Sequence, residues 1–259
     1  MAVETTTFSN NSADTWFRDI MFDCVLCPRA CHVNRLAGQT GYCGQTAELM
    51  AARASLHYWE EPCISGTSGS GTVFFSGCNL RCVFCQNHNI ALGKAGRVIA
   101  PEHLAEIFLQ LQEQGANNIN LVGFVPQIVI ALEQAKQQGL HLPIVYNTGS
   151  YESPEALRHL EGLVDIYLPD LKYFSPELST AYSHAPDYFE TACAAISEMY
   201  RQVGDSVIDE DTGLMQHGMI VRHLLLPGQT KDSKKILRYL HETYGDHIYI
   251  SIMNQYTPL

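Results

Sequence analysis

The sequence of 259 residues is short of charge, and most of the charge it has is negative. Charged residues make up 17% of the chain, and 16 Lys and Arg stand against 27 Asp and Glu, for a net charge of −11. Ordinary globular proteins carry about a quarter charged residues, so this composition favours a large buried fraction. There is no block of Lys or Arg to attract phosphates, which argues against nucleic acid as a partner.

A long apolar run and a basic start are also missing. No hydrophobic stretch approaches the roughly 20 residues that a membrane-spanning helix needs, so no membrane partner is expected. The segment 1–20 is polar and slightly acidic, unlike a secretory signal. Nine cysteines in such a chain indicate metal ligands more than disulfides, and their odd number argues against a complete disulfide set. We therefore expect a cytoplasmic protein.

Strand and helix signals alternate from residue 72 onward. Strands are predicted at 72–76, 118–123, 142–146, 163–168, 219–226 and 247–253, and helices at 101–114, 126–138, 153–160, 186–203 and 233–244. This alternation is typical of βαβ units and a parallel sheet. Six strands are too few for a closed eight-stranded barrel, which leaves a partial (β/α)6 TIM-like barrel or an open doubly wound sheet. We favour the α/β partial barrel, with its functional groups at the carboxyl ends of the strands.

Three parts are expected along the chain: a polar segment over 1–20, a small cysteine-rich metal-binding module over 21–66, and the main core over 67–259. A stretch of Gly, Ser and Thr at 65–71 joins the module to the core. The chain stops soon after the last predicted strand, without a helix to cover it. We therefore expect a core that is truncated at its carboxyl end.

Cys78, Cys82 and Cys85 follow the first predicted strand directly. Their C-x3-C-x2-C spacing suits three thiolates around a 4Fe–4S cluster whose fourth iron has no protein ligand. An open iron can chelate the amino and carboxylate groups of S-adenosylmethionine (SAM) and pass an electron to its sulfonium. Phe84 lies where a ring can pack over the adenine. The alternative is a structural zinc knuckle, but such sites use four ligands, and of the nearby residues only His88 could be the fourth.

Residues 71–89 resemble the radical SAM superfamily and, within it, the glycyl radical enzyme activating enzymes, in particular the pyruvate formate-lyase activating enzyme-like proteins, whose substrate is uncertain. Similar segments extend over most of the chain, at 24–31, 41–44, 59–66, 165–172 and 221–228. The resemblance implies an oxidoreductase that cleaves SAM to a 5′-deoxyadenosyl radical and abstracts a hydrogen atom. It also implies a low-potential electron donor, flavodoxin or ferredoxin, and a protein substrate such as a glycyl radical enzyme. The alternatives are radical modification of another peptide or a small molecule, and a non-catalytic iron–sulfur protein with impaired SAM binding.

Polar residues at the predicted strand ends are candidates for holding SAM. Asn147 and Thr148 end the third strand, where the resemblance implies contacts with the ribose hydroxyls. Lys172 is placed to meet the SAM carboxylate, and Asp170 to hold a monovalent cation or a water; an exposed ion pair is the alternative for these two. Arg222, on the fifth strand, is a further candidate for the carboxylate, with a buried structural Arg as its alternative.

Two segments depart from the pattern of the activating enzymes. Residues 121–127 are about three residues shorter than the stretch that holds the SAM amino group in those enzymes, so Gly123 is the remaining candidate there. After the third strand the order is Thr-Gly-Ser-Tyr instead of Thr-Ser-Gly-Tyr, which moves the glycine available for positive φ. We expect these departures to weaken SAM binding more than cluster binding.

Cys24, Cys27, Cys31 and Cys43 form a second group, spaced C-x2-C-x3-C-x11-C. Four thiolates suit zinc, a single rubredoxin-like iron or a second 4Fe–4S cluster, and the spacing does not choose among them. A complete ligand set leaves no open position, so we expect a structural or electron-transfer role.

Overall fold

A computed structural model describes residues 12–123 and 126–256 of the protein. Six parallel strands form its centre and lie side by side in chain order: β2 (Ser70–Phe75), β4 (Ile119–Val122), β5 (Ile144–Thr148), β6 (Ile166–Pro169), β8 (Met215–Leu224) and β9 (Tyr249–Met253). A doubly wound sheet would reverse its order at a switch point. The sequential order supports the partial barrel, and within the described ranges β9 pairs with β8 alone, which leaves the barrel open there.

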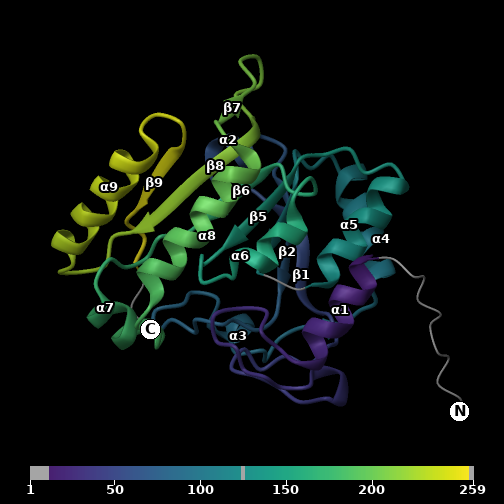
Figure 1. The fold of residues 1–259 in the computed structure, drawn as a ribbon. Coiled ribbons are helices and arrows are strands. Elements are labelled where there is room, and N and C mark those ends of the chain that lie inside the picture. Colours follow the sequence, from purple (N-terminus) through teal and green to yellow (C-terminus); the bar gives the residue numbers. More distant parts are fainter. Residues whose placement is uncertain (1–11, 124–125, 257–259) are drawn as a thin grey trace, which may run out of the picture.

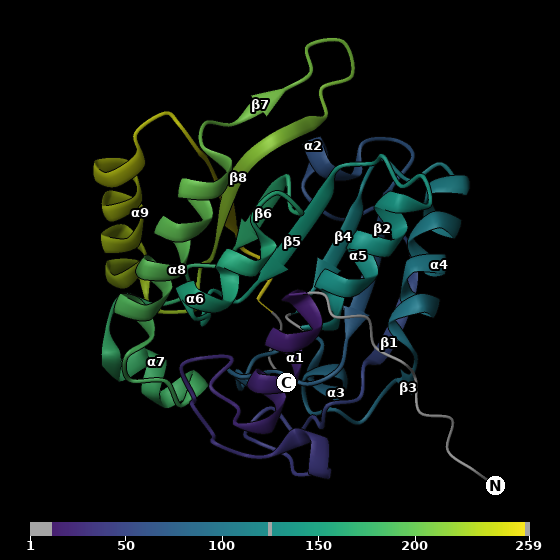
Figure 2. The same ribbon diagram turned by 45° about the vertical axis from the view of Figure 1, so that its right-hand side comes forward.

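The connecting helices cover the outer face of this curved sheet, as Figures 1 and 2 show. They are α4 (Pro101–Glu113), α5 (Gln127–Gln137), α6 (Pro154–Leu157) with the 3-10 turn η2 (Arg158–Leu160), α8 (Tyr188–Val203) and α9 (Thr230–Tyr244). Right-handed crossovers place them on one side because every connection advances in the same direction. Leu104 and Phe108 of α4, for example, are fully buried in one core with Ile119 and Leu121 of β4.

Several elements have no counterpart among the sequence predictions, among them three strands and an eight-residue helix. The strand β1 (Met50–His57) pairs antiparallel with β2 and, through Met50 and Ala51, with β3 (Arg97–Val98), so the sheet continues into the range expected for the cysteine-rich module. The strand β7 (Val207–Ile208) forms a hairpin with β8, which therefore begins four residues before the predicted start at 219. The helix α7 (Pro176–Ser183) buries Ser179 and Ser183, so its buried side lacks the apolar periodicity that reveals a helix.

The inside of the barrel has an apolar layer near the amino ends of the strands. The short helix α2 (Pro62–Ser65) covers this end and inserts Ile64. Around Ile64 pack inward-facing residues of the strands: Val145, Ile166, Leu168, Met215 and Ile220. The layer fills the barrel near the amino ends of the strands.

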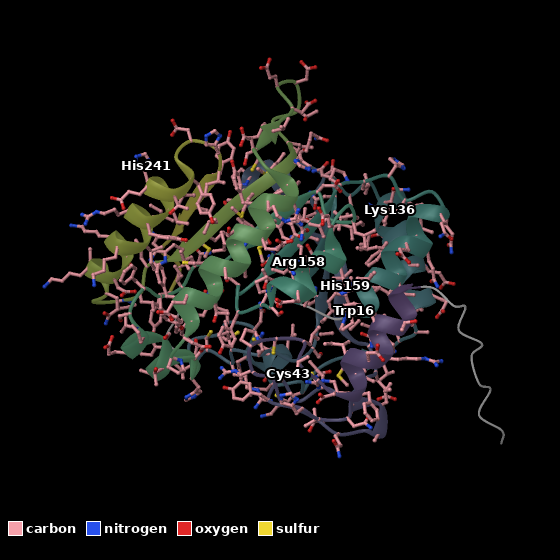
Figure 3. All side chains as sticks on the ribbon, in the orientation of Figure 1. Trp16, Cys43, Lys136, Arg158, His159 and His241 are labelled. Carbon is pink, nitrogen blue, oxygen red and sulfur yellow. The ribbon has the colours of Figure 1, made fainter. Side chains whose placement is uncertain are left out.

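The short helix α3 (His88–Ala91) and the N-terminal segment lie at the carboxyl ends of the strands. The segment contains α1 (Ser12–Phe22) and the 3-10 turn η1 (Arg35–Ala37), and Cys43 lies at the same end in Figure 3. Trp16 of α1 stacks on His159 of η2, with 3.8 Å between the ring centroids. In the part of the chain that the structure covers, no helix is long and apolar enough to cross a membrane.

Candidate active site

Cys78, Cys82 and Cys85 share the loop between β2 and α3. The chain leaves β2 through Gly77, whose φ of +88° favours glycine, and a Cβ there would lie 2.5 Å from Cγ of Gln45. The backbone nitrogen of Cys85 donates to the carbonyl oxygen of Cys82 at 3.1 Å, which closes a tight turn between them. The structure thus gathers the three cysteines at the carboxyl end of the first parallel strand.

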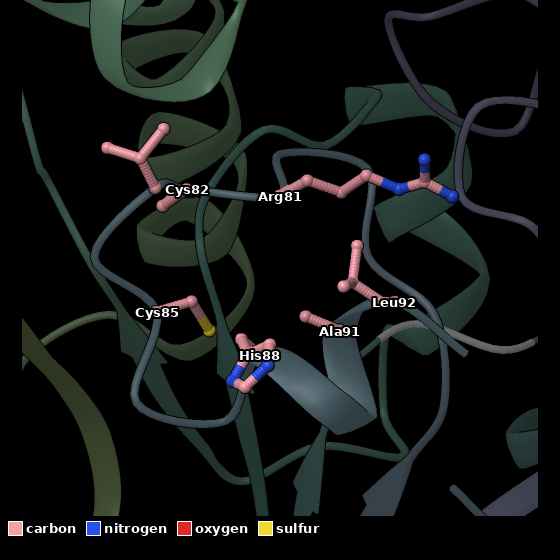
Figure 4. A pocket seen from close by; sticks show the side chains of 7 residues that line it. Arg81, Cys82, Cys85, His88, Ala91 and Leu92 are labelled. Atoms are coloured by element: carbon pink, nitrogen blue, oxygen red, sulfur yellow. The ribbon is translucent and has the colours of Figure 1, made fainter. Parts of the chain in front are cut away.

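A pocket of about 280 Å³ opens beside this loop, lined by Arg81, Cys82, Val83, Cys85, His88, Ala91 and Leu92. In Figure 4 the Cys85 sulfur points toward His88, whereas Arg81 extends away from the cysteines. Burial raises the pKa of Cys78 and Cys85, so protons must leave these thiols when iron binds.

The donor set of this loop suits a 4Fe–4S cluster. Among the described residues, no three His, Cys, Asp or Glu side chains converge so that they could share one metal ion, as a zinc knuckle requires. A 4Fe–4S cluster makes no such demand, because each thiolate binds a different iron. Cys78, Cys82 and Cys85 therefore fit the cluster that their spacing predicts.

Charged side chains form a connected group inside the barrel, next to the cysteine loop. Lys172 Nζ lies 2.5 Å from Asp170 Oδ2, and Arg222 Nε donates to Asp170 Oδ1 at 2.9 Å. Burial opposes the ionisation of Asp170, but Arg222 and Lys172 outweigh it and hold the pKa of this carboxyl below its ordinary value. The Lys172 pKa is raised despite burial, because of Asp170 and Cys82. The pair is therefore charged, and its charges act on the cysteine loop.

Glu60, which the sequence did not single out, completes this group. Its carboxylate accepts hydrogen bonds from Arg222 Nη1 at 2.8 Å, from Asn147 Nδ2 at 3.0 Å and from Asn120 Nδ2 at 3.2 Å. Arg222 Nη2 also donates to Asn147 Oδ1 at 2.6 Å. Arg222 is therefore engaged by three neighbours, as a structural Arg would be. The only sequence signal for Glu60 is its place in the segment 59–66 that resembles the activating enzymes.

The side chains of the neighbouring residues Asn147 and Thr148 do not both face this site. Successive residues of a strand face opposite sides, so Asn147 points into the barrel and Thr148 toward the helices. Thr148 Oγ1 lies 2.6 Å from Glu152 Oε1, and burial raises the pKa of Glu152 to about 7. The expectation that both residues meet one ribose is thus not matched by the position of Thr148.

Phe84 and Gly123 are the other two candidates for contacts with SAM. The Phe84 ring packs against Tyr173, Tyr182 and Tyr256, with centroids 6.2 to 6.3 Å apart. Gly123 has a φ of +105°, and its nitrogen donates to the carbonyl oxygen of Asn147 at 3.2 Å. The shortened loop that follows it includes residues 124–125, which lie outside the described residues.

Three of the four N-terminal cysteines surround Arg35, which is only 5% exposed. Arg35 Nε donates to Cys24 Sγ at 3.0 Å and Nη2 to Cys43 Sγ at 3.4 Å. A Cβ on Gly41 would lie 2.9 Å from both Cys31 Sγ and Arg35 Nη2, so Cys31 belongs to the same group.

Cys27 lines a separate pocket with Glu152, Pro154 and Thr191, and burial raises its pKa to about 12. The N-terminal segment therefore holds one buried cation, Arg35, near the sulfur atoms of Cys24, Cys31 and Cys43.

Comparison with known proteins places this site in a family. The model of the family described as "Radical SAM superfamily" matches residues 72–240, which is more than half of the chain and includes the cysteine loop, Asp170, Lys172 and Arg222.

Individual relatives are more distant. "Uncharacterized protein MJ0674" of Methanocaldococcus jannaschii is 28% identical over 251 residues, which cover 93% of this chain and 68% of that protein. The pyruvate formate-lyase-activating enzyme of Clostridium pasteurianum is 29% identical over 121 residues, covering 42% of this chain and 48% of that enzyme.

Among solved structures, a histidine-tagged protein described as "anSMEcpe with bound AdoMet" has a TM-score of 0.45 and 14% identity. It covers 71% of this chain, which spans about half of that protein. On the match of the family model, the chain belongs to the radical SAM superfamily.

Proposed function

We propose that the chain is a radical SAM oxidoreductase that holds a 4Fe–4S cluster on Cys78, Cys82 and Cys85 and abstracts a hydrogen atom from its substrate. Membership of the superfamily implies SAM-dependent radical chemistry, with a 4Fe–4S cluster and SAM as cofactors. The observation that carries the proposal is the cysteine loop at the carboxyl end of β2, within the stretch that the family model matches.

The cluster, when bound, supplies one electron to the sulfonium of SAM, whose C5′–S bond breaks to give methionine and a 5′-deoxyadenosyl radical. Lys172 and Asp170 are 18% and 16% exposed, so a ligand in the barrel mouth can reach them. Lys172 neutralises the SAM carboxylate, and Asp170 holds the lysine in place or binds a cation or water beside it. Gly123 lies next to the amino group.

Asn147 and Phe84 bind the nucleoside half of SAM in this proposal. The Asn147 amide keeps one N–H and one lone pair for a ribose hydroxyl after its bonds to Arg222 and Glu60. Arg222 acts on SAM through Asn147, which it orients. Phe84 packs over the adenine, and its three tyrosine neighbours fix the ring.

The substrate we propose is a glycine of a protein, as in activation of a glycyl radical enzyme. The partial likeness to the Clostridium pasteurianum enzyme and the motifs at 165–172 and 221–228 support this choice. Flavodoxin or ferredoxin supplies the electron, and free thiols suit a cytoplasmic location. A different peptide or a small molecule is the second candidate, because the sequence contains no motif for substrate contacts.

The N-terminal cysteines bind a metal centre in our proposal. Cys24, Cys31 and Cys43 lie around Arg35, whose positive charge offsets the negative charge of several thiolates. Four thiolates suit zinc, a single iron or a second iron–sulfur cluster, and metal analysis has to choose among them.

An anaerobic turnover assay tests the proposed activity. The full chain is reconstituted with iron and sulfide, then mixed with SAM and a low-potential reductant, and 5′-deoxyadenosine is measured. We expect product from the wild type and none from Cys82→Ala, whereas Cys193→Ala, on α8, keeps it. An absence of product from a wild type that carries the cluster would favour the non-catalytic alternative.

A second assay addresses the substrate. Pyruvate formate-lyase is added to the same mixture, and the glycyl radical is sought by electron paramagnetic resonance (EPR). SAM cleavage without a glycyl radical on this probe would favour another peptide or a small molecule. Metal analysis of a Cys78/Cys82/Cys85 triple variant reports on the N-terminal group alone, where about four irons per chain indicate a second cluster.

A further inference from the structure

The carboxyl end of α7 packs directly on the cysteine loop. The backbone nitrogen of Val83 donates to the carbonyl oxygen of Tyr182 at 2.9 Å. From the N-terminal segment, Arg29 donates to the carbonyl oxygens of Ser183 at 3.0 Å and His184 at 2.5 Å. The end of α7 is therefore fixed from two sides, and Ser183, its last residue, is completely buried.

Two hydroxyl groups form a chain that ends at one of the cluster ligands. Ser183 Oγ lies 2.9 Å from Cys82 Sγ, and Tyr173 OH lies 2.7 Å from Ser183 Oγ. A thiolate that binds iron has no proton and can only accept. Ser183 must then donate to Cys82, which leaves its oxygen to accept from Tyr173. The chain therefore runs from Tyr173 through Ser183 to Cys82, and the Tyr173 hydroxyl also lies near Cys82 itself.

The other two ligands receive hydrogen bonds of a different kind. Cys78 Sγ accepts from the backbone nitrogen of Leu80 at 3.4 Å, and Cys85 accepts from the backbone of Asn87. Such bonds come with the fold of the loop and survive any change of side chain. The bond to Cys82 comes from a side chain on a separate helix, so it can be removed without altering the loop.

We propose that Ser183, oriented by Tyr173, is a positioning residue that raises the reduction potential of the cluster through its hydrogen bond to Cys82. The inference rests on the cluster assignment of the proposed function. A hydrogen bond to a cluster sulfur stabilises the more negative, reduced state, and such bonds are among the factors that set cluster potentials. One electron enters from a low-potential donor, and both hydroxyl groups keep their protons.

An EPR-monitored redox titration of the reconstituted full chain tests this role. For Ser183→Ala we expect the equilibrium constant for cluster reduction to fall roughly tenfold, which corresponds to a potential about 59 mV more negative. Tyr173→Phe should shift the potential in the same direction by less, since Ser183 keeps its bond but loses its donor. The control is Ser179→Ala, the same change on the same helix. Ser179 is also buried, but its hydroxyl bonds the helix carbonyl of Pro176 at 3.1 Å, so no shift is expected.

A spectroscopic signature separates a direct bond from a packing effect. In D2O, pulsed magnetic resonance of the reduced cluster should detect an exchangeable deuteron that is lost in Ser183→Ala and kept in Ser179→Ala. An unchanged potential and an unchanged deuteron signal in Ser183→Ala would overturn the inference.

A failure to assemble the cluster can be told apart from a failure of this inference. If Ser183→Ala assembles no cluster, the titration of Tyr173→Phe decides, and an unshifted potential there also overturns the inference. If the wild type itself binds no 4Fe–4S cluster, the cluster assignment fails, and this inference fails with it.

Discussion

Glu60 and Arg222 are 162 residues apart in the sequence and form an ion pair inside the barrel, with 2.8 Å between Oε1 and Nη1. Both side chains are 11% exposed. Glu60 arrives from the loop before α2, whereas Arg222 belongs to β8. The pair therefore joins the segment that closes the barrel to β8, whose Arg222 also holds Asp170 and Asn147 of the candidate SAM site.

Replacing Glu60 should destabilise the fold strongly. Among the described residues, Glu60→Ala leaves the buried Arg222 with Asp170 as its one ion-pair partner. Removing one member of a buried pair costs about 3–5 kcal/mol. Urea denaturation measures the loss of unfolding free energy. Glu161→Ala is the matched control, because Glu161 and Arg201 are also 2.8 Å apart but about half exposed, so little change is expected. Equal losses in the two variants would contradict the role of burial.

The order of strands and helices followed from the sequence because apolar periodicity is a local property. The segments 101–114 and 186–203 show it and are α4 and α8 in the structure. Helix α7 could not be found in this way, since it buries Ser179 and Ser183. Its contact with Cys82 is made over 101 residues, a relationship that no local pattern encodes.

The candidate site was predicted in part for the same reason. Cys78, Cys82 and Cys85 share a loop, so their spacing contained the information. Glu60 has partners on β4, β5 and β8, and only the closing of the barrel brings these together. The position of Thr148 could have been foreseen, because a residue next to Asn147 on a strand must face the other side.

The loop entrance at Gly77 should control cluster assembly. Gly77→Ala forces an L-residue to a φ of +88° and places its Cβ 2.9 Å from the carbonyl oxygen of Cys43. Gly139→Ala meets a φ of +105° but no atom within 4 Å, so it carries a backbone cost of about 1–2 kcal/mol without the clash. We expect iron and sulfide content after reconstitution to fall several-fold in the first variant only. Similar contents in both variants would show that the close approach of Gly77 to Cys43 is not needed.

Lys172 should contribute to SAM affinity, and its replacement should not prevent cluster assembly. Lys172→Gln removes the charge proposed to meet the SAM carboxylate, and Asp170 keeps Arg222 as a partner, so the fold should persist. Loss of one charged hydrogen bond should raise the SAM dissociation constant at least about tenfold. Equilibrium binding to anaerobically reconstituted protein measures this, with iron content as the check on the cluster. Lys136→Gln is the control, because Lys136 bonds the carbonyl oxygens of Gly162 and Leu163 on the outer face. An unchanged constant in Lys172→Gln would remove Lys172 from the SAM site.

Glu152 should make the stability of the protein depend on pH. Burial raises its pKa from 4.5 to about 7, so between these values the unfolded chain releases a proton that the folded protein keeps. The free energy of unfolding therefore falls as pH rises from 4.5 to about 7, by up to about 3 kcal/mol, and no further above that. Glu152→Gln cannot ionise and should lose this dependence. Urea denaturation should therefore show that the wild type loses more unfolding free energy between pH 5 and pH 8 than Glu152→Gln does. Glu155→Gln is the control. In the wild type, a hydrogen bond from Ser153 lowers the pKa of the exposed Glu155 carboxyl, so the effect of this substitution on the pH dependence of stability should be small and of opposite sign. A wild type and Glu152→Gln that respond alike would mean that Glu152 is ionised in the fold, in contact with Thr148.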